Sequence, residues 1–494
     1  MTSTGTVRGR TEDGLAVFRG IPFAQPPVGE ARFAAPRPAV PWDGVREAVA
    51  FGPEPPQTPL GPGIPVTPGD SPDWLTVNVW TPAPDRSARR PVLVYVHGGG
   101  YASGSAAEYN GRRLAREGDL VLVTFNYRVG VEGFAQIEGA PANRGLLDQV
   151  AALRWVQENI TAFGGDPGRV TVFGESAGGG SIAALLAMPG AKGLFQQACA
   201  QSVPGTFFSG ELAADIAATL ARPLGLRASA AELSAVEPHK LAEAAAALMR
   251  SMTGHLDRWG VVARTVTPFS PVVDGEILPQ APWQALASGA AREVPLIVGH
   301  NRDEFQLFHV VRGQVGTITA EQAGTALRSF GPGPDPEAAY RAAFPDASDE
   351  QLYVLVQSDW TFRMPTLRLA EAQIAGGGRA HVYELTWPAP ANNGLLGACH
   401  ALDVPLTFGE YDGIAQLLGL APTPETEAVS ERFRTAWTAF ATDGSPGWPA
   451  YDPERRLVQV MDTEPAVTAY PEETSRRLWQ HHTFDTLPLL GAGG

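Results

Sequence analysis

The sequence is poor in cysteine, in positive charge and in long apolar runs. Of its 494 residues only Cys199 and Cys399 are cysteines, so no disulfide framework is available and one bridge at most can form. The formal net charge of −15 repels phosphate groups, which disfavours nucleic acid and anionic lipid as partners. No stretch is apolar over the roughly 20 residues that a membrane-spanning helix needs. We therefore expect a cytoplasmic location, no membrane span and no nucleic-acid partner.

The N-terminus also lacks the features of a secretory leader. The stretch MTSTGTVRGRTEDG has no basic start followed by an apolar run and a small-residue cleavage site. A hydrophobic content of 44% with 18% charged residues is that of a folded chain with a sizeable core. Because α/β enzymes often run long as one unit, we expect a single domain over residues 1–494.

Short apolar runs bounded by Gly, Pro or Asp recur, and their length and β-branched content predict buried strands. These runs are residues 92–96, 120–125, 170–173, 294–298, 381–385 and 457–461. Between the second and third runs, Leu146, Leu147, Val150, Leu153, Val156 and Ile160 repeat at three- and four-residue steps. This spacing predicts a helix over 143–163 with one buried stripe. Strand, helix and strand in this order indicate an α/β fold with a mostly parallel sheet covered on both faces.

Three other segments have a different character. Residues from about 205 to 262 and from about 313 to 378 are rich in Ala, Glu and Leu with helical periodicity. We expect both to be helical insertions that roof a site beyond the carboxyl ends of the strands. The proline-rich stretch 53–72 is predicted to form a surface loop, because proline cannot pair within a central strand.

A Gly-x-Ser-x-Gly string follows the predicted strand 170–173. Gly174, Ser176 and Gly178 form it, and a small-residue, helix-compatible stretch comes next. A strand, a sharp turn with serine and a helix together are typical of a nucleophile elbow. Ser176 is therefore the candidate nucleophile, and a plain structural turn is the alternative.

A second glycine-rich segment, His97-Gly98-Gly99-Gly100, follows the strand 92–96. Backbone without side chains can point several N–H groups at one place, so we predict an oxyanion hole built from Gly99, Gly100 and the N–H of Ala177. A flexible turn or a phosphate loop is the alternative. A phosphate loop would need a Lys or Ser/Thr partner, which is missing here.

The remaining catalytic partners must follow the serine in the order acid, then histidine. His400, in a loop after the strand 381–385, is the histidine that fits this order best. The others precede the serine, fall in the first helical segment, flank the acid, lie in a strand or sit in the tail: His97, His239, His255, His300, His309, His381, His481 and His482. For the acid, Asp303 and Glu304 follow the strand 294–298, and spacing alone cannot separate them.

Ordered blocks run along the whole chain: FRGIPFAQPPVG at 18–29, LTVNVWTP at 75–82, NYRVG at 126–130, NRGLLDQ at 143–149 and FGGDP at 163–167, followed by the elbow. Together these blocks resemble the type-B carboxylesterase family, which includes the cholinesterases and the bacterial para-nitrobenzyl esterases. The bacterial branch is the nearer match. The resemblance implies the α/β-hydrolase fold and a serine carboxylesterase acting on small neutral alkyl and aryl esters. No metal cluster or nucleotide fingerprint is apparent in the sequence, so we expect no cofactor or metal.

The resemblance also assigns residues. The family's triad glutamate maps onto Glu304 and its histidine, which precedes an acidic-hydrophobic-Pro block, onto His400. It implies that Glu175 and Ser202 support the triad from buried positions, with plain structural hydrogen bonding as the alternative.

The chain departs from the family at several positions. Pro55 and Trp74 stand where secreted members pair cysteines, which fits an intracellular location. Phe305 and Ala401 replace glycines after the acid and the histidine, and Val203 replaces the glycine of Gln-Ser-Gly.

Other functions remain open on the sequence. The same triad would serve an aryl carbamate or amide hydrolase, because the leaving group is selected by the pocket and not by the catalytic residues. A triglyceride lipase is a further option. An esterase-like adhesion or scaffold protein without catalysis is the alternative from another class, although the full set of catalytic residue types is present. The sequence does not fix the oligomeric state, and we expect a monomer.

Overall fold

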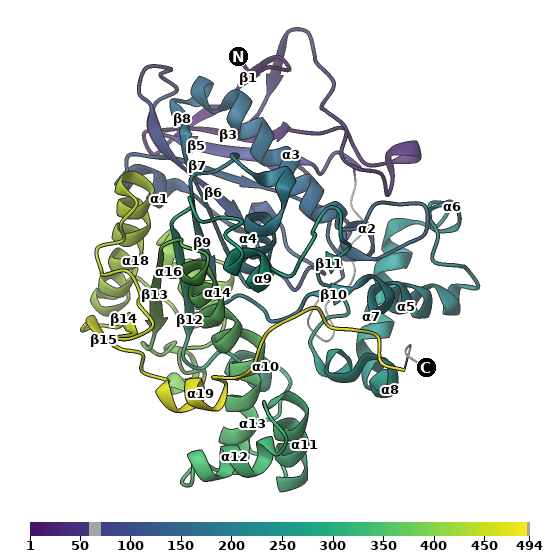
Figure 1. The fold of residues 1–494 in the computed structure, drawn as a ribbon. Coiled ribbons are helices and arrows are strands. Elements are labelled where there is room, and N and C mark those ends of the chain that lie inside the picture. Colours follow the sequence, from purple (N-terminus) through teal and green to yellow (C-terminus); the bar gives the residue numbers. More distant parts are fainter. Residues whose placement is uncertain (59–70, 492–494) are drawn as a thin grey trace. The chain divides into compact units, whose positions relative to one another are not determined.

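The computed structural model describes residues 1–58 and 71–491 and forms two compact units. Unit 1 comprises Met1–Ala198, Thr206–Ala285 and Thr486–Gly494, and unit 2 comprises Cys199–Gly205 and Leu286–Asp485. Both units combine strands with helices (Figure 1). The single domain expected over 1–494 stays a prediction. Of the proline-rich loop, residues 59–70 lie outside the described residues, and 53–58 contain no helix or strand.

The main strands of unit 1 lie in the order β8-β6-β7-β5-β3-β2. β6 pairs in parallel with β7 and β8, whereas β7, β5, β3 and β2 pair antiparallel in turn. The strands of this unit are β1 (Thr6–Arg8), β2 (Arg10–Glu12), β3 (Leu15–Pro22), β4 (Val45–Glu47), β5 (Thr76–Thr81), β6 (Arg90–Val96), β7 (Val121–Phe125), β8 (Gly165–Glu175), β10 (Phe208–Ser209) and β11 (Val272–Val273). Every residue of β5 and β7 is buried, as expected for β-branched and aromatic runs covered on both faces. The predicted strands 92–96, 120–125 and 170–173 are confirmed, the last as part of a longer strand.

The helix predicted over 143–163 is confirmed as α3 (Arg144–Asn159), continued by a 3₁₀ turn, Ile160–Phe163. Its stripe is buried except at Leu147, which is half-buried. Gly164 ends the turn at φ 86, a conformation that glycine adopts without strain. The other helices of unit 1 are α1 (Arg112–Glu117), α2 (Gly130–Phe134), α4 (Ala177–Ala187), α5 (Gly210–Ala221), α6 (Ala230–Leu233), α7 (Pro238–Ser251) and α8 (Leu256–Trp259). The first proposed insertion, 205–262, thus contains α5 to α8.

Two elements run from unit 1 into unit 2 along the chain, β9 (Gln197–Gln201) and α9 (Pro282–Ala287). In unit 2 the strand order is β15-β14-β13-β12-β9. β12 (Leu296–Asn301), β13 (Ala380–Leu385) and β14 (Leu457–Met461) are parallel neighbours, and β15 (Ala466–Ala469) closes this edge antiparallel to β14. The strand predicted at 294–298 begins two residues later and continues to Asn301. It starts after Pro295, which has no N–H, and its polar end pairs with β13.

The helices of unit 2 are α10 (Gln306–Val311), α11 (Ala320–Phe330), α12 (Pro336–Ala343), α13 (Asp349–Ser358), α14 (Met364–Ala375), α15 (Ala391–Gly394), α16 (Asp403–Phe408), α17 (Ile414–Leu417), α18 (Pro424–Asp443) and α19 (Glu473–Leu478). A π-helical turn, Asp359–Arg363, joins α13 to α14. Within unit 2, α14 packs on β12 and β13, and α11 packs on α13 (Figure 1). In the described part of the chain, no helix combines the length and the apolar character that crossing a membrane requires.

Candidate active site

Ser176 stands at the turn between β8 and α4, with φ 57 and ψ −123. A serine with positive φ is rare and strained, and such strain is concentrated at functional sites. The helix that follows is entirely buried, and its first turn begins at Ala177. The predicted strand, sharp turn and helix are therefore present, and the serine caps a helix whose first N–H groups are open to negative charge.

The glycines of this turn are required by close backbone contacts. A Cβ on Gly178 would lie 2.1 Å from the carbonyl oxygen of Val96 at the end of β6. A Cβ on Gly174 would lie 2.7 Å from the same oxygen. Because no real Cβ approaches an oxygen this closely, the two glycines allow the turn to pack directly against β6.

The glycine-rich segment after β6 is a tight turn of left-handed residues. Gly99 and Gly100 have φ 108 and 60, and a Cβ on Gly99 would lie 2.1 Å from the carbonyl oxygen of Ser103. The N–H groups of Ala102 and Ser103 both donate to the Gly99 carbonyl at 3.0 Å. The N–H groups of Gly99, Gly100 and Ala177 donate to no group within residues 1–58 and 71–491, so they are available to a ligand.

The turn is anchored by His97. Its Nδ1 lies 2.9 Å from the Gly98 carbonyl oxygen, and its ring stacks on Tyr127 with centroids 4.2 Å apart. The Tyr127 hydroxyl donates to the His97 carbonyl oxygen at 2.7 Å. Burial lowers the pKa of His97 to about 4, so the ring is neutral at physiological pH.

Within unit 1, the glycine-rich turn after β6 also packs against Ser176 and Glu175. A Cβ on Gly98 would lie 2.9 Å from the Glu175 carbonyl oxygen and 3.2 Å from the Ser176 Cβ. The Glu175 side chain is buried, with its Oε2 3.1 Å from the same point. Residues 97–100 and 174–178 are called the nucleophile region below. It brings Ser176, Glu175 and the glycine turn together.

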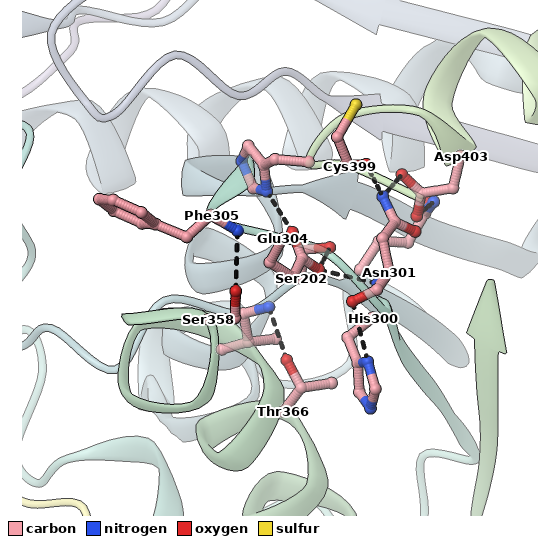
Figure 2. A network of polar contacts seen from close by, with 12 residues as sticks. Ser202, His300, Asn301, Glu304, Phe305, Ser358, Thr366, Cys399 and Asp403 are labelled. Atoms are coloured by element: carbon pink, nitrogen blue, oxygen red, sulfur yellow. Dashed lines mark hydrogen bonds and ion pairs between the residues drawn. The ribbon is translucent and has the colours of Figure 1, made fainter. Parts of the chain in front are cut away.

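In unit 2, Glu304 and His400 form a hydrogen-bonded pair. Glu304 Oε2 lies 2.6 Å from His400 Nδ1. The other oxygen, Oε1, accepts the Ser202 hydroxyl at 2.6 Å and the Asn301 N–H at 2.8 Å. The Glu304 side chain is fully buried, so its charge is held by these three donors (Figure 2). Ser202, residues 301–304 and residues 398–403 are called the acid–base region below.

The contact with Glu304 fixes the chemistry of the imidazole. An ionised carboxylate accepts hydrogen bonds and cannot donate them, so the proton of neutral His400 is on Nδ1. The Nε2 atom is then the basic atom of the ring. Phe362, from the π-helical turn, stacks on the imidazole with centroids 4.2 Å apart and planes at 25°, and Phe308 contacts it at 5.3 Å. The ring is therefore held on its edge by a carboxylate and on its face by aromatic side chains.

A second buried carboxylate, Asp403, supports the first. It accepts the Tyr383 hydroxyl at 2.6 Å and the Gln201 amide at 2.7 Å. The Asn301 amide donates to it at 3.4 Å (Figure 2). Burial raises the pKa of Asp403 above its usual range, against the effect of these donors. Asn301 thus links Asp403 to Glu304.

The structure separates the two acid candidates that the sequence left open. Glu304 contacts the imidazole, whereas Asp303 accepts the Ala398 N–H at 2.9 Å. Sequence reasoning did not assign Asp403, Tyr383 or Phe362 to the site. The acidic-hydrophobic-Pro block that begins at Asp403, directly after the histidine loop, was a usable signal for this residue. Phe362 sits in a π-helical turn that apolar periodicity does not reveal.

Two of the departures from the family directly follow the acid and the histidine. Phe305 is buried, and its N–H donates to the Ser358 hydroxyl at 3.0 Å (Figure 2). Ala401 has φ 65, a conformation in which glycine would be unstrained. His381 lies in β13 and is a buried core histidine, with its Nδ1 3.1 Å from the Trp448 carbonyl oxygen.

Known proteins resemble this chain over nearly its full length. A model of the carboxylesterase family matches residues 1–329. A para-nitrobenzyl esterase of Bacillus subtilis is 38% identical over 492 residues, which cover 96% of this chain and 97% of that protein. A phenmedipham hydrolase of Pseudarthrobacter oxydans is 35% identical over 486 residues, covering 95% of this chain and 96% of that protein. The crystal structure of a Geobacillus stearothermophilus carboxylesterase matches with a TM-score of 0.84 at 36% identity, covering 97% of this chain and 99% of that one.

These similarities confirm two predictions. The fold is the α/β-hydrolase fold, with parallel strands flanked by helices. The resemblance stated on sequence blocks alone is also correct. The chain belongs to the carboxylesterase family and is a carboxylic ester hydrolase.

Proposed function

We propose that this protein is a serine esterase for small neutral carboxylic esters, both short-chain alkyl and aryl, with Ser176, His400 and Glu304 as its catalytic triad. The observation that carries the proposal is the 2.6 Å hydrogen bond between Glu304 Oε2 and His400 Nδ1. It leaves a basic Nε2 on a ring whose orientation is fixed, which is what a serine nucleophile requires. The strained turn at Ser176 supports the choice of nucleophile.

The proposed reaction has two similar halves. His400 Nε2 accepts the proton of the Ser176 hydroxyl as its oxygen attacks the ester carbonyl carbon. The N–H groups of Gly99, Gly100 and Ala177 stabilise the oxyanion that forms. Collapse of this intermediate expels the alcohol, which takes the proton from the imidazole. Water then attacks the acyl-enzyme by the same route and releases the acid.

Glu175 and Ser202 are proposed to support this chemistry without contacting substrate. Ser202 donates to the Glu304 oxygen that does not face the imidazole, which orients the carboxylate. Glu175 is buried against Gly98, so it supports the start of the glycine turn. No cofactor or metal takes part in the proposed reaction, and a chelator is expected to leave the rate unchanged.

The substrate class rests on the relatives and on charge. A relative named para-nitrobenzyl esterase supports esters whose alcohol part carries an aromatic ring, and a relative named phenmedipham hydrolase keeps aryl carbamates in the test. The net charge of −15 disfavours anionic substrates at the encounter step. The test is a hydrolysis panel of para-nitrophenyl esters of increasing acyl length, benzyl esters, phthalate esters and aryl carbamates, with Ser176→Ala as the blank. Faster turnover of carbamates than of every ester would overturn the assignment.

We further propose that the protein acts as a cytoplasmic monomer built as one domain, without nucleic-acid partners. Both cysteines are buried and free, and Pro55 and Trp74 replace the cysteines that secreted members pair, which supports a reducing location. Light scattering after gel filtration tests the monomer, and a single cooperative unfolding transition tests the single domain.

A further inference from the structure

Two neighbouring carboxylates follow β12, and only one of them contacts the imidazole. Glu304 binds the ring of His400, whereas Asp303 Oδ2 accepts the N–H of Ala398 at 2.9 Å, two residues before the histidine. We propose that Asp303 is a positioning residue, which fixes the loop 398–400 so that the imidazole stays against Glu304. The inference rests on the proposed role of His400 as the base.

Asp303 hydrogen-bonds to both backbone groups of Ala398. The Asp303 N–H donates to the Ala398 carbonyl oxygen at 2.8 Å, while the carboxylate receives the Ala398 N–H, and Asp303 and Cys399 form an isolated parallel bridge. The next carbonyl, that of Cys399, accepts the Asn301 amide at 2.7 Å (Figure 2). The loop therefore reaches His400 already tied at two consecutive residues.

Gly397 permits this contact. It has φ 58, and a Cβ there would lie 2.4 Å from Asp303 Oδ2 and 2.8 Å from its Cγ. The carboxylate thus occupies the space in which any other residue would place its side chain. The loop approaches Asp303 this closely because residue 397 is glycine.

The acceptor oxygen of Asp303 matters more than its charge. Its ion pair with Arg302 is 3.4 Å long, and the two side chains are 35% and 42% exposed, so water screens it. A backbone N–H needs an oxygen acceptor, which an asparagine also offers. The structure therefore separates two roles, since asparagine would replace an acceptor but not a charge.

The test compares Asp303→Ala with Asp303→Asn in the full-length protein, using a para-nitrophenyl ester and steady-state kinetics. Asp303→Ala is expected to lower kcat by about 10- to 100-fold, as small displacements of catalytic groups do. KM should stay within about twofold, because substrate binding is not the property that changes. Asp303→Asn should restore most of kcat. In the proton NMR spectrum, the downfield signal of His400 Nδ1–H should weaken in the alanine variant and return in the asparagine variant.

A matched control separates this inference from a general effect of charge. Glu293→Ala removes a carboxylate that, like Asp303, pairs with the preceding arginine, at 3.1 Å, but lies on the exposed surface. It should keep the wild-type kcat. Equal losses in Asp303→Ala and Asp303→Asn would overturn the inference, as would wild-type kcat in Asp303→Ala.

A second variant covers the case in which Asp303→Ala does not fold. Gly397→Ala keeps every carboxylate but forces Asp303 and the loop apart, so kcat should fall by about 10- to 100-fold as well. Wild-type kcat in folded Gly397→Ala overturns the inference. His400→Gln distinguishes the two proposals. If this variant keeps full activity, the proposed triad fails. If it loses activity while the Asp303 and Gly397 variants keep the wild-type kcat, only the positioning role of Asp303 fails.

Discussion

The nucleophile region and the acid–base region reach their geometry by different means. The nucleophile region is made by backbone: glycines at 98, 99, 174 and 178 allow contacts that a Cβ would prevent, and Ser176 itself is strained. The acid–base region is made by side chains from distant segments, in which Glu304 receives three hydrogen bonds. A backbone site depends on which residues are glycine. A side-chain site depends on each polar atom having its partner, so the two regions should respond differently to substitution.

The largest expected effect is in the acid–base region. Glu304→Gln keeps the size of the side chain but offers an amide in place of the carboxylate, which no longer selects the Nδ1–H tautomer of His400. We expect kcat to fall by about 10⁴-fold with little change in the fold, as when the acid of a serine-protease triad is neutralised. Steady-state kinetics and circular dichroism check this. A loss below tenfold would show that the carboxylate charge is not needed.

The nucleophile region should respond to a methyl group alone. Gly99→Ala places a Cβ 2.1 Å from the Ser103 carbonyl oxygen and moves the N–H groups of the turn. We expect kcat to fall by about 10²–10³-fold, the cost of losing one oxyanion donor. Gly210→Ala is the matched control, because its Cβ would meet nothing within 4 Å. Normal kcat in Gly99→Ala would mean that this turn does not hold the oxyanion.

Burial lowers the pKa of two histidines to about 4: His97, within the nucleophile region, and His300, the residue directly before the acid–base segment 301–304. The unfolded chain binds their protons first, so stability is complete above pH 6.5 and is lost as pH falls from 6.5 towards 4. Protonation of each histidine should lower the free energy of unfolding by about 1.5 kcal/mol between about pH 6.5 and 5.

Urea denaturation at the two pH values measures this loss. His97→Gln and His300→Gln should each reduce the difference between the two values. An unchanged difference in either variant would show that the corresponding histidine takes up its proton over the same pH range in the native state as in the unfolded chain.

The smallest effect is expected at the face of the imidazole. Phe362→Leu keeps an apolar contact with His400 but removes the ring that stacks on it at 4.2 Å. Aromatic pairs contribute about 0.5–1.5 kcal/mol beyond the area they bury, so kcat should fall by about two- to tenfold. A larger loss of kcat, close to that of Glu304→Gln, would mean that the stack, and not the carboxylate, orients the ring.

This difference between a backbone site and a side-chain site also explains which site residues the sequence could predict. The nucleophile region lies on contiguous motifs, so residue type and predicted strands are enough to propose Ser176, Gly99 and Gly100 as site residues. The acid–base region joins side chains from separate segments. Neither spacing nor periodicity distinguished Glu304 from Asp303, and the resemblance to the family was needed.

Misplaced and missed strands have a similar cause. β12 extends beyond its apolar run through Gly299, His300 and Asn301, because its polar end builds the site and pairs with β13. β9, with the sequence QACAQ, contains no β-branched residue, so it gave no strand signal although most of it is buried. A strand that carries polar site residues is difficult to recognise from hydrophobicity alone.

The most direct test of the account is labelling with an organophosphate, followed by peptide mass spectrometry, because it asks whether residues from both regions act on one atom. We predict a single adduct on the peptide that carries Ser176, formed far more slowly in folded His400→Gln than in the wild type. An adduct on another residue, or equal labelling rates in the two proteins, would contradict the proposed triad.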